Sequence, residues 1–400
     1  MAKLRCVRRK RFNKKENEVV YMRILVDLKD FPASKKFTYL NAASIGLMWD
    51  KASAAIIEWQ EDLALNGTSN FDEKAEEEVF EQLRQFTASL LNANPADIAG
   101  GSSATELMSS VAWAVMPPKG TNIISCDVVH PSSIYPWVRV ARHTGAKVIF
   151  AKNTNGYIPP ERLYDLIDKS TSIVCISHVE YSGGQIYDLK KLAEKAHAVG
   201  ALLVVDATQS AGAVPINVRA MGVDVLVSGS YKWLTGPFGV AVLYLAPHLQ
   251  KKLNPGLVGW RSHRDMWDFD STRLVYADTA KKFEFSTMSY GNVIGLTKAM
   301  EYLLKLGIKE IQEFNMFLAD LLIEGFKKRG AEIISPEKKE ERSSIVSIRF
   351  PRRRSSEIAR HLNANNIIIS QRKDFLRFSP HLYNTVQDIN KVFQVLDKVL

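Results

Sequence analysis

The sequence contains few cysteines and has no long run of apolar residues. Its three cysteines among 400 residues, Cys6, Cys126 and Cys175, are scattered and lack the spacing of metal ligands. This excludes a disulfide framework and favours a reducing compartment, so we expect a cytoplasmic protein with no bound metal. No apolar stretch is long enough to span a bilayer, and we expect no membrane partner.

Two nucleotide-binding motifs are missing as well. The sequence has neither a glycine-rich dinucleotide fingerprint nor a phosphate motif of the Gly-Lys-Ser/Thr type, which disfavours a dehydrogenase or an ATPase. Hydrophobic residues make up 46% of the chain and charged residues 24%, as in soluble globular proteins with a sizeable core. The length favours two lobes.

The net charge of +10 is concentrated at the amino terminus. Residues 1–15 carry eight lysines and arginines and no acidic residue, which leaves about +2 for the rest of the chain. We expect residues 1–21 to form a disordered basic tail. Such a tail is either a basic arm for RNA or an upstream extension without a binding role. Because the remainder is nearly neutral, we do not expect nucleic acid as a partner.

The rest of the chain is organised around residues 223–239, Val-Asp-Val-Leu-Val-Ser-Gly-Ser-Tyr-Lys-Trp-Leu-Thr-Gly-Pro-Phe-Gly. The apolar, β-branched run predicts a buried strand, and Lys232 follows its end between Tyr231 and Trp233. Desolvation there would lower the pKa of the lysine towards that of a neutral, nucleophilic amine, which an imine-forming lysine needs. A surface loop lysine is the alternative.

A second apolar run, residues 201–205, ends in a carboxylate, Asp206. An acidic residue at the carboxyl end of a buried parallel strand faces the crevice where open α/β sheets bind ligands. Pyridoxal phosphate needs both a lysine for its aldehyde and a carboxylate for its protonated ring nitrogen. Taken alone, Asp206 could be a helix N-cap.

Strands and helices alternate through the middle of the chain. We expect further strands at residues 121–125, 147–150 and 172–177, with helices at 107–116, 161–168 and 189–199, so the fold class is α/β with a mostly parallel sheet covered by helices. A long helical region at 293–329 leads to a small α+β domain with strands at 345–350 and 367–370 and a helix at 355–362. We place the large domain at residues 22–280 and the remainder at 281–400.

Two loops offer ligand-binding groups. Residues 100–106, Gly-Gly-Ser-Ser-Ala-Thr-Glu, precede an apolar helix whose first backbone N–H groups suit a phosphate, although such loops are common. His130 follows the strand at 121–125, where an ordinary loop histidine is the alternative to a functional one.

Three motifs together carry a family resemblance: residues 177–189, Ser-His-Val-Glu-Tyr-Ser-Gly-Gly-Gln-Ile-Tyr-Asp-Leu; residues 205–209, Val-Asp-Ala-Thr-Gln; and residues 230–237, Ser-Tyr-Lys-Trp-Leu-Thr-Gly-Pro. The chain resembles the class V branch of the fold-type I pyridoxal-phosphate enzymes from about Tyr39 onwards. That branch includes class V aminotransferases, cysteine desulfurases, selenocysteine lyases, kynureninase-like enzymes and isopenicillin N epimerase-like proteins. The resemblance implies a pyridoxal 5'-phosphate cofactor and an amino-acid substrate.

The resemblance also implies roles for single residues. Lys232 would bond covalently to the cofactor beside Tyr231, Asp206 would pair with the ring nitrogen, and Gln209 would bond the phenolate oxygen. His130 would stack on the ring and move protons. The phosphate would be bound by the Ala104 N–H group, by Thr105 and, from the partner subunit of a homodimer, by Thr287.

The substrate side is implied by two further segments. Arg377 falls on the carboxylate-binding arginine of the family and precedes a Tyr-Asn-Thr run; Arg372 is the reserve candidate, and a surface arginine is the alternative for either. A guanidinium can grip a carboxylate through two parallel hydrogen bonds. Asn41, in the segment at residues 39–46, would line the mouth of the site.

The reaction is less well specified than the cofactor. Residues 355–377 contain no cysteine, so the nucleophilic thiol of cysteine desulfurases is absent there, and Tyr181 replaces their asparagine. We therefore expect an aminotransferase, with a Cα/Cβ lyase or an epimerase as the alternative. A non-catalytic nucleic-acid-binding protein on a degenerate enzyme fold is a further alternative, disfavoured by the intact set of Lys232, Asp206, His130 and Gln209.

Overall fold

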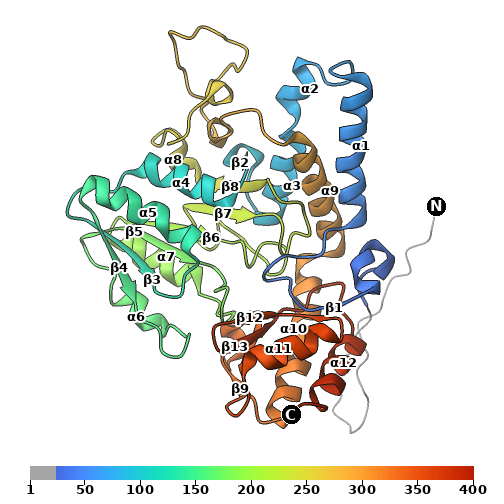
Figure 1. The fold of residues 1–400 in the computed structure, drawn as a ribbon. Helices are drawn as coiled ribbons and strands as arrows, with labels where there is room; N and C mark the ends of the chain where they lie inside the picture. Colours follow the sequence, from blue (N-terminus) through green and yellow to red (C-terminus); the bar gives the residue numbers. More distant parts are fainter. Residues whose placement is uncertain (1–23) are drawn as a thin grey trace, which may run out of the picture.

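A seven-stranded sheet forms the centre of the larger domain in the computed structural model, which describes residues 24–400 (Figure 1). The predicted tail at residues 1–21 lies outside these residues. The strand order is β2-β8-β7-β6-β5-β3-β4. The five strands from β7 to β4 in this order are parallel to one another. At the other edge β8 pairs antiparallel with β7, and β2 pairs antiparallel with β8. The strands are β2 (Ile98–Gly101), β3 (Asn122–Cys126), β4 (Lys147–Ala151), β5 (Thr171–Ser177), β6 (Leu202–Asp206), β7 (Val225–Gly229) and β8 (Ala241–Leu245).

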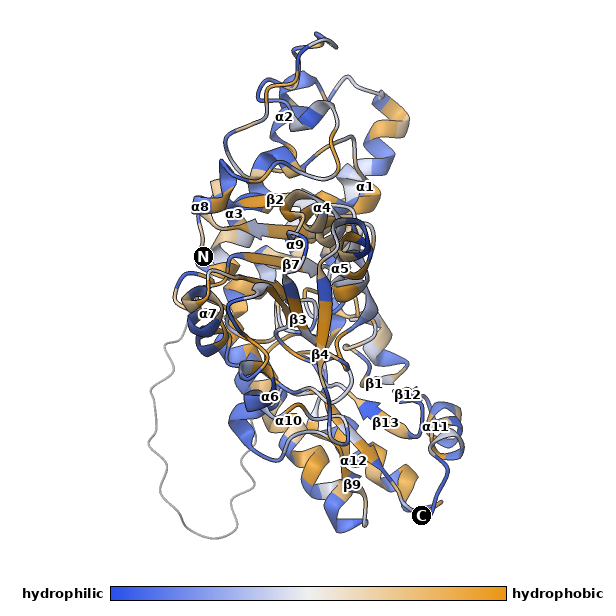
Figure 2. Ribbon diagram, turned by 90° about the vertical axis from the view of Figure 1, so that its left-hand side faces the viewer, coloured by the Kyte–Doolittle hydropathy of each residue, from blue (hydrophilic) through white to orange (hydrophobic). Residues whose placement is uncertain are grey.

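Helices cover both faces of this sheet. α4 and α5 lie on one face and α7 on the other, with the apolar strands between them (Figure 2). Two faces buried in this way explain why the inner strands read as continuous apolar runs. A further layer of α1, α3 and α9 packs beside the edge formed by β2. The helices of this domain are α1 (Asp50–Asn66), α2 (Glu73–Glu78), α3 (Glu81–Leu91), α4 (Ala104–Val115), α5 (Pro131–Thr144), α6 (Pro160–Tyr164), α7 (Leu189–Ala198), α8 (Pro247–Gln250) and α9 (Tyr290–Leu306).

The smaller domain has an antiparallel sheet of order β12-β13-β10-β9. Its strands are β9 (Glu332–Ile333), β10 (Val346–Arg349), β12 (Ser370–Arg372) and β13 (Phe375–Phe378), and its helices are α10 (Ile308–Lys328), α11 (Ser355–Ala364) and α12 (Val386–Leu396). The amino-terminal segment joins this domain, because β1 (Thr38–Tyr39) pairs in parallel with β11 (Ile367–Ile368). Short 3-10 helices occupy Leu28–Asp30, Pro32–Lys35, Pro95–Asp97, Trp260–Ser262, Ala280–Phe283 and Lys339–Glu341.

The structure confirms the predicted fold class, a large, mostly parallel α/β domain with a small α+β domain. The five parallel strands lie within two residues of their expected bounds, whereas α6 ends at Tyr164, short of the expected 168. The long helical region is two helices that meet at Gly307, whose φ of 90° favours glycine. The domain division at residue 280 stays a prediction; the larger hydrophobic core includes residues of α9, and the smaller core includes Leu40.

The carboxyl ends of the parallel strands point towards the small domain, and the loops after β3, β5, β6 and β7 gather there. Open α/β sheets bind their ligands at this edge. No helix within residues 24–400 is long and apolar enough to cross a membrane. In the same residues no cluster of three or more histidine, cysteine or acidic side chains has the arrangement of a metal site.

Candidate active site

Lys232 lies three residues after the end of β7, with 9% of its surface exposed. Among the described residues its amine has no hydrogen-bond or ion-pair partner. Burial lowers the pKa of the amine to about 8, against the opposing effect of the Asp206 carboxylate. Arg377 and Arg372 add smaller lowering contributions. The lysine is therefore a buried base that is readily deprotonated, as the sequence predicts.

The backbone of Lys232 is fixed by the amino-terminal segment. The Gly46 N–H donates to the Tyr231 carbonyl over 2.8 Å. A Cβ atom at Gly46 would lie 1.9 Å from the carbonyl oxygen of Lys232, so only glycine permits this approach. Gly46 of the segment at residues 39–46 thus fixes the backbone that carries Lys232.

Asp206 ends β6, next to β7, and is held from two sides. Ser133 Oγ donates to Asp206 Oδ2 over 2.5 Å, and the Thr208 N–H donates to Oδ1 over 2.9 Å. Neither donor is a cation, so the carboxylate keeps its negative charge available for a cationic partner in the pocket. This is the arrangement that a protonated pyridine nitrogen requires.

The amino terminus of α4 supplies a site for an anion. Ser103 is the N-cap, and its Oγ accepts from the Glu106 N–H over 3.1 Å. The N–H groups of Ala104 and Thr105 belong to the first turn, which carries the positive end of the helix dipole. Both residues line the same pocket as Lys232 and so suit the phosphate of a bound cofactor.

His130 is the N-cap of α5, and its Nδ1 accepts from the Ser132 N–H over 3.2 Å. Its ring lies edge-on to that of Tyr181, with 5.2 Å between the ring centroids. Burial lowers the pKa of His130, and the Lys232 amine lowers it further. The ring is therefore neutral at pH 7 and offers an apolar face at the pocket.

One pocket brings together seven of the predicted residues. Its lining includes Ala104, Thr105, His130, Asp206, Gln209, Tyr231 and Lys232. A buried amine without a partner, a carboxylate on the neighbouring strand and a helix N-terminus match the aldehyde, the ring nitrogen and the phosphate of pyridoxal phosphate. The residues present fit this cofactor, and their individual roles stay predictions.

The two arginines of the small domain lie beside this pocket. Arg377 is on β13, 1% exposed, and donates to the Tyr181 carbonyl and, over 2.6 Å, to Ser44 Oγ. Arg372 Nη2, from β12, donates to the same Ser44 oxygen over 3.1 Å. Both guanidinium groups influence the pKa of Lys232. The two guanidinium groups thus lie close together beside the pocket, and their roles in substrate binding stay predictions.

Besides the two arginines, two predicted residues, Asn41 and Thr287, are absent from the lining of this pocket. Asn41 Oδ1 accepts from Ser370 Oγ over 2.7 Å, and the same Ser370 hydroxyl accepts from Arg377. Thr287 is exposed in the loop before α9. A role for Thr287 in a partner subunit stays a prediction.

Reasoning from the sequence missed two serines that organise the site. Ser133 holds Asp206, and Ser44 accepts hydrogen bonds from both arginines. Single serines carry no spacing or charge signal, so only the spatial contact reveals them. Ser44 does fall in the segment at residues 39–46, which the sequence assigns to the mouth of the site.

Comparison with known proteins decides the family. The model of the family described as "Aminotransferase class-V" matches residues 38–392. The chain belongs to this family. It is 28% identical to the uncharacterized aminotransferase YcbU of Bacillus subtilis (strain 168) over 90% of this chain and 93% of that protein. It is 28% identical to a kynureninase of Bacillus mycoides (strain KBAB4) over 94% of this chain and 92% of that protein.

A solved structure shows the same fold. The cysteine desulfurase CsdA of Escherichia coli matches with a TM-score of 0.82 and 25% identity over 92% of this chain and 96% of that one. Family membership confirms the predicted resemblance. It also confirms the prediction of a pyridoxal-phosphate-dependent enzyme of class V that acts on an amino acid.

Proposed function

We propose that the chain transfers the amino group of an amino acid, with pyridoxal phosphate held in the pocket that Lys232 lines. The bound cofactor supplies an electron-withdrawing ring that acidifies the α-proton of the substrate. Asp206 holds the protonated ring nitrogen, the first turn of α4 binds the phosphate, and His130 lies against the ring.

The chain's own residues then move one proton and fix one carboxylate. With the cofactor bound, Lys232 Nζ as a neutral amine would take the proton from the substrate Cα and return it to the cofactor carbon that is bonded to the substrate nitrogen, for which a pKa of about 8 is well suited. Arg377 binds the α-carboxylate and so keeps the Cα–H bond directed at the lysine. Its hydrogen bonds to the Tyr181 carbonyl and Ser44 support this positioning.

One observation favours amino-group transfer over sulfur transfer to an enzyme thiol: no cysteine lines the pocket among the described residues. Cys126 and Cys175 are buried, so neither supports transfer of sulfur to an enzyme thiol. A Cα/Cβ lyase or an epimerase is the second candidate. The same lysine and arginine would serve it, and several relatives are named probable cysteine desulfurases.

The test is to incubate the holoenzyme with a panel of amino acids that includes cysteine. We expect keto-acid production and a shift of the visible absorption band to that of the aminated cofactor. If only racemisation or elimination is observed, the lyase or epimerase replaces amino-group transfer as the proposed reaction. A protein that binds cofactor but responds to no amino acid would support the non-catalytic alternative.

A homodimer is part of this proposal. Thr287 is exposed and outside the pocket of its own chain, as a contact to a partner's phosphate requires. Its segment is tied to the phosphate loop, because Glu284 accepts from the Gly100 N–H over 3.0 Å and from Arg84 over 2.7 Å. Sedimentation should show that the protein is a dimer. Thr287→Val should weaken the retention of the cofactor and leave the dimer intact. A cytoplasmic location stays a prediction.

A further inference from the structure

The site contains two cationic side chains and no matching anion. Within residues 24–400 neither Arg377 nor Arg372 forms an ion pair with a carboxylate; Arg377 donates to the Tyr181 carbonyl, Ser44 and Ser370, and Arg372 to Ser44. A buried guanidinium without a counter-ion is unfavourable, because neutral oxygens replace only part of its hydration. Ligands from outside the chain are therefore expected to supply the negative charge.

Each arginine also has a donor without an acceptor. The Nε atoms of Arg372 and Arg377 are both buried and have no hydrogen-bond partner. A carboxylate binds a guanidinium through two parallel N–H···O hydrogen bonds, so each free Nε–H can donate one of the two bonds that a carboxylate would accept. The shared acceptor, Ser44 Oγ, holds the two groups side by side. Burial lowers the pKa of Arg377 to about 9, with a further contribution from the nearby Arg372 charge.

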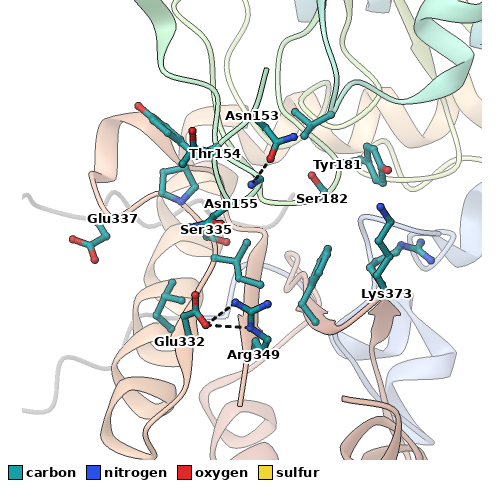
Figure 3. A pocket seen from close by; sticks show the side chains of 18 of the residues that line it. Asn153, Thr154, Asn155, Tyr181, Ser182, Glu332, Ser335, Glu337, Arg349 and Lys373 are labelled. Atoms are coloured by element: carbon teal, nitrogen blue, oxygen red, sulfur yellow. Dashed lines mark hydrogen bonds and ion pairs between the residues drawn. The ribbon is translucent and has the colours of Figure 1, made fainter. Parts of the chain in front are cut away.

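A second, larger cavity adjoins the inner pocket at Tyr181. This cavity has a volume of about 920 Å³ and lies between the two domains; Arg372 and Tyr181 both line it, and Tyr181 also lines the inner pocket. Figure 3 shows Tyr181 and Ser182 of the large domain with Lys373 of the small domain near them. The space is sufficient for an extended substrate side chain.

Most other charges around this cavity are already paired. Arg349 contacts Glu332 and Asp374, and Glu341 contacts Lys338. Glu337, which has no ion-pair partner among the described residues, is on the opposite side of the view from Tyr181 (Figure 3). Arg349 and, to a smaller extent, Lys373 lower the pKa of the Asp374 carboxyl, so among the described residues the positive charge left without a carboxylate at this end of the cavity is that of Arg372.

We propose that Arg372 binds a second anionic group, carried by the side chain of the substrate, so that the amino donor is a dianionic amino acid. The inference rests on the proposed function, in which Arg377 binds the α-carboxylate. A neutral side chain would leave the buried Nε of the half-buried Arg372 without an acceptor and the guanidinium charge without a counter-ion, which disfavours neutral donors. Arg372 is then the residue that determines specificity, and the substrate class is that of amino acids with a side-chain carboxylate or a comparable anion.

The test measures binding to the holoenzyme by titration calorimetry. The probes are the dicarboxylates malonate, succinate and glutarate, compared with the monocarboxylates propionate and butyrate. We expect the best dicarboxylate to bind about 10- to 100-fold more tightly than butyrate, as one additional charged hydrogen-bond pair would give. Arg372→Gln should remove this preference, lowering the affinity for the dicarboxylates far more than the affinity for butyrate.

Three further variants control the result. Arg377→Gln should weaken both classes of ligand, and Arg372→Lys should retain part of the preference because it retains the charge. Arg352→Gln, at an exposed arginine outside the site, should behave as the unaltered protein. Retention of the visible cofactor band identifies variants that are folded.

Two outcomes would overturn the proposal. One is an unaltered protein that binds monocarboxylates as tightly as dicarboxylates. The other is an Arg372→Gln variant that loses affinity for both classes equally, which would mean that the two arginines share a single carboxylate. Calorimetry measures binding and not turnover. If the protein does not transfer amino groups, the preference for dicarboxylates can still be observed; if the Arg372 subsite is wrong, that preference is absent.

Discussion

Trp233 donates a hydrogen bond from Nε1 to Oε1 of Gln209 over 2.8 Å, and both side chains are buried. Gln209 Nε2 in turn donates to the Ala43 carbonyl over 2.8 Å. Since Trp233 directly follows Lys232, the amide of Gln209 links the loop after β6 to the reactive lysine and to the amino-terminal segment. One Nε2 hydrogen remains for the predicted bond to the cofactor phenolate.

We therefore expect Gln209→Ala to affect stability more than its cofactor contact alone would suggest. The variant leaves the Trp233 N–H and the Ala43 carbonyl buried without partners, at a cost of about 1–3 kcal/mol each. The free energy of unfolding of the apoprotein should fall by roughly 2–6 kcal/mol in urea titrations. Gln371→Ala, at an exposed glutamine, is the matched control and should change it by less than ~0.5 kcal/mol. Equal stability of the two variants would contradict the structural role of Gln209.

Lys232 should titrate well below an ordinary lysine in the apoprotein. Its pKa is lowered to about 8, so the neutral, reactive fraction rises as the pH increases through 8 and not through the usual value of 10.5. Competitive labelling with trace acetic anhydride across this range, followed by peptide mapping, measures the midpoint. Borohydride reduction of the holoenzyme should attach the pyridoxyl group to the same lysine.

The direction in which the labelling midpoint shifts in two variants tests this explanation. Asp206 raises the pKa of Lys232, so Asp206→Asn should shift the labelling midpoint to lower pH; Arg377 lowers the pKa, so Arg377→Gln should shift the midpoint to higher pH. A midpoint near 10.5, or a pyridoxyl label on another lysine, would refute the assignment of Lys232.

Much of this site could be predicted because strand ends have a recognisable sequence pattern. Apolar runs that end in Asp206 and lead to Lys232 fix the two groups at one edge of a parallel sheet. The antiparallel strands β2 and β8 were not predicted, because their place at the sheet edge depends on pairing between residues far apart in the chain. Strand β13, which carries Arg377, was missed for the same reason.

The contacts that tune the site depend on side chains brought together only by folding. Ser133 reaches Asp206 from the first turn of α5, and the buried His381 contacts the Trp233 carbonyl at 3.0 Å from beyond β13. Neither contact has a local signal, because each partner is an ordinary residue in its own segment. The shared Ser44 contact of the two arginines is of the same kind.

Asp206→Asn should separate cofactor binding from turnover. The helix N-terminus and Lys232 remain, so the variant should retain bound cofactor. A neutral amide cannot hold the ring nitrogen protonated, and we expect the loss of most turnover, on the order of 100-fold or more. Absorption spectra measure occupancy, and keto-acid formation measures the rate. Ser133→Ala, which removes a donor to the same carboxylate while retaining its charge, should have a smaller effect. Near-native turnover in Asp206→Asn would disprove the pairing.

Both cysteines in the described part of the chain are buried and free. Cys126 donates to Glu180 Oε1 over 3.2 Å and Cys175 to the Ser133 carbonyl over 3.5 Å, both in the interior. Burial raises the pKa of both thiols, and it raises the pKa of Glu180 to about 8, so that this carboxyl group is mostly protonated at pH 7. Thiols that are neither ionised nor accessible are poor nucleophiles.

During turnover with cysteine we therefore expect no persulfide on the enzyme. Alkylation of the native holoenzyme followed by peptide mapping should leave Cys126 and Cys175 unmodified, and alkylation after unfolding should label both. Cys6 lies outside the described residues and is mapped in the same experiment. Cys126→Ala should retain amino-group transfer, since the thiol takes no part in it. A persulfide on any of the three cysteines during turnover would overturn the amino-transfer proposal and favour a desulfurase reaction.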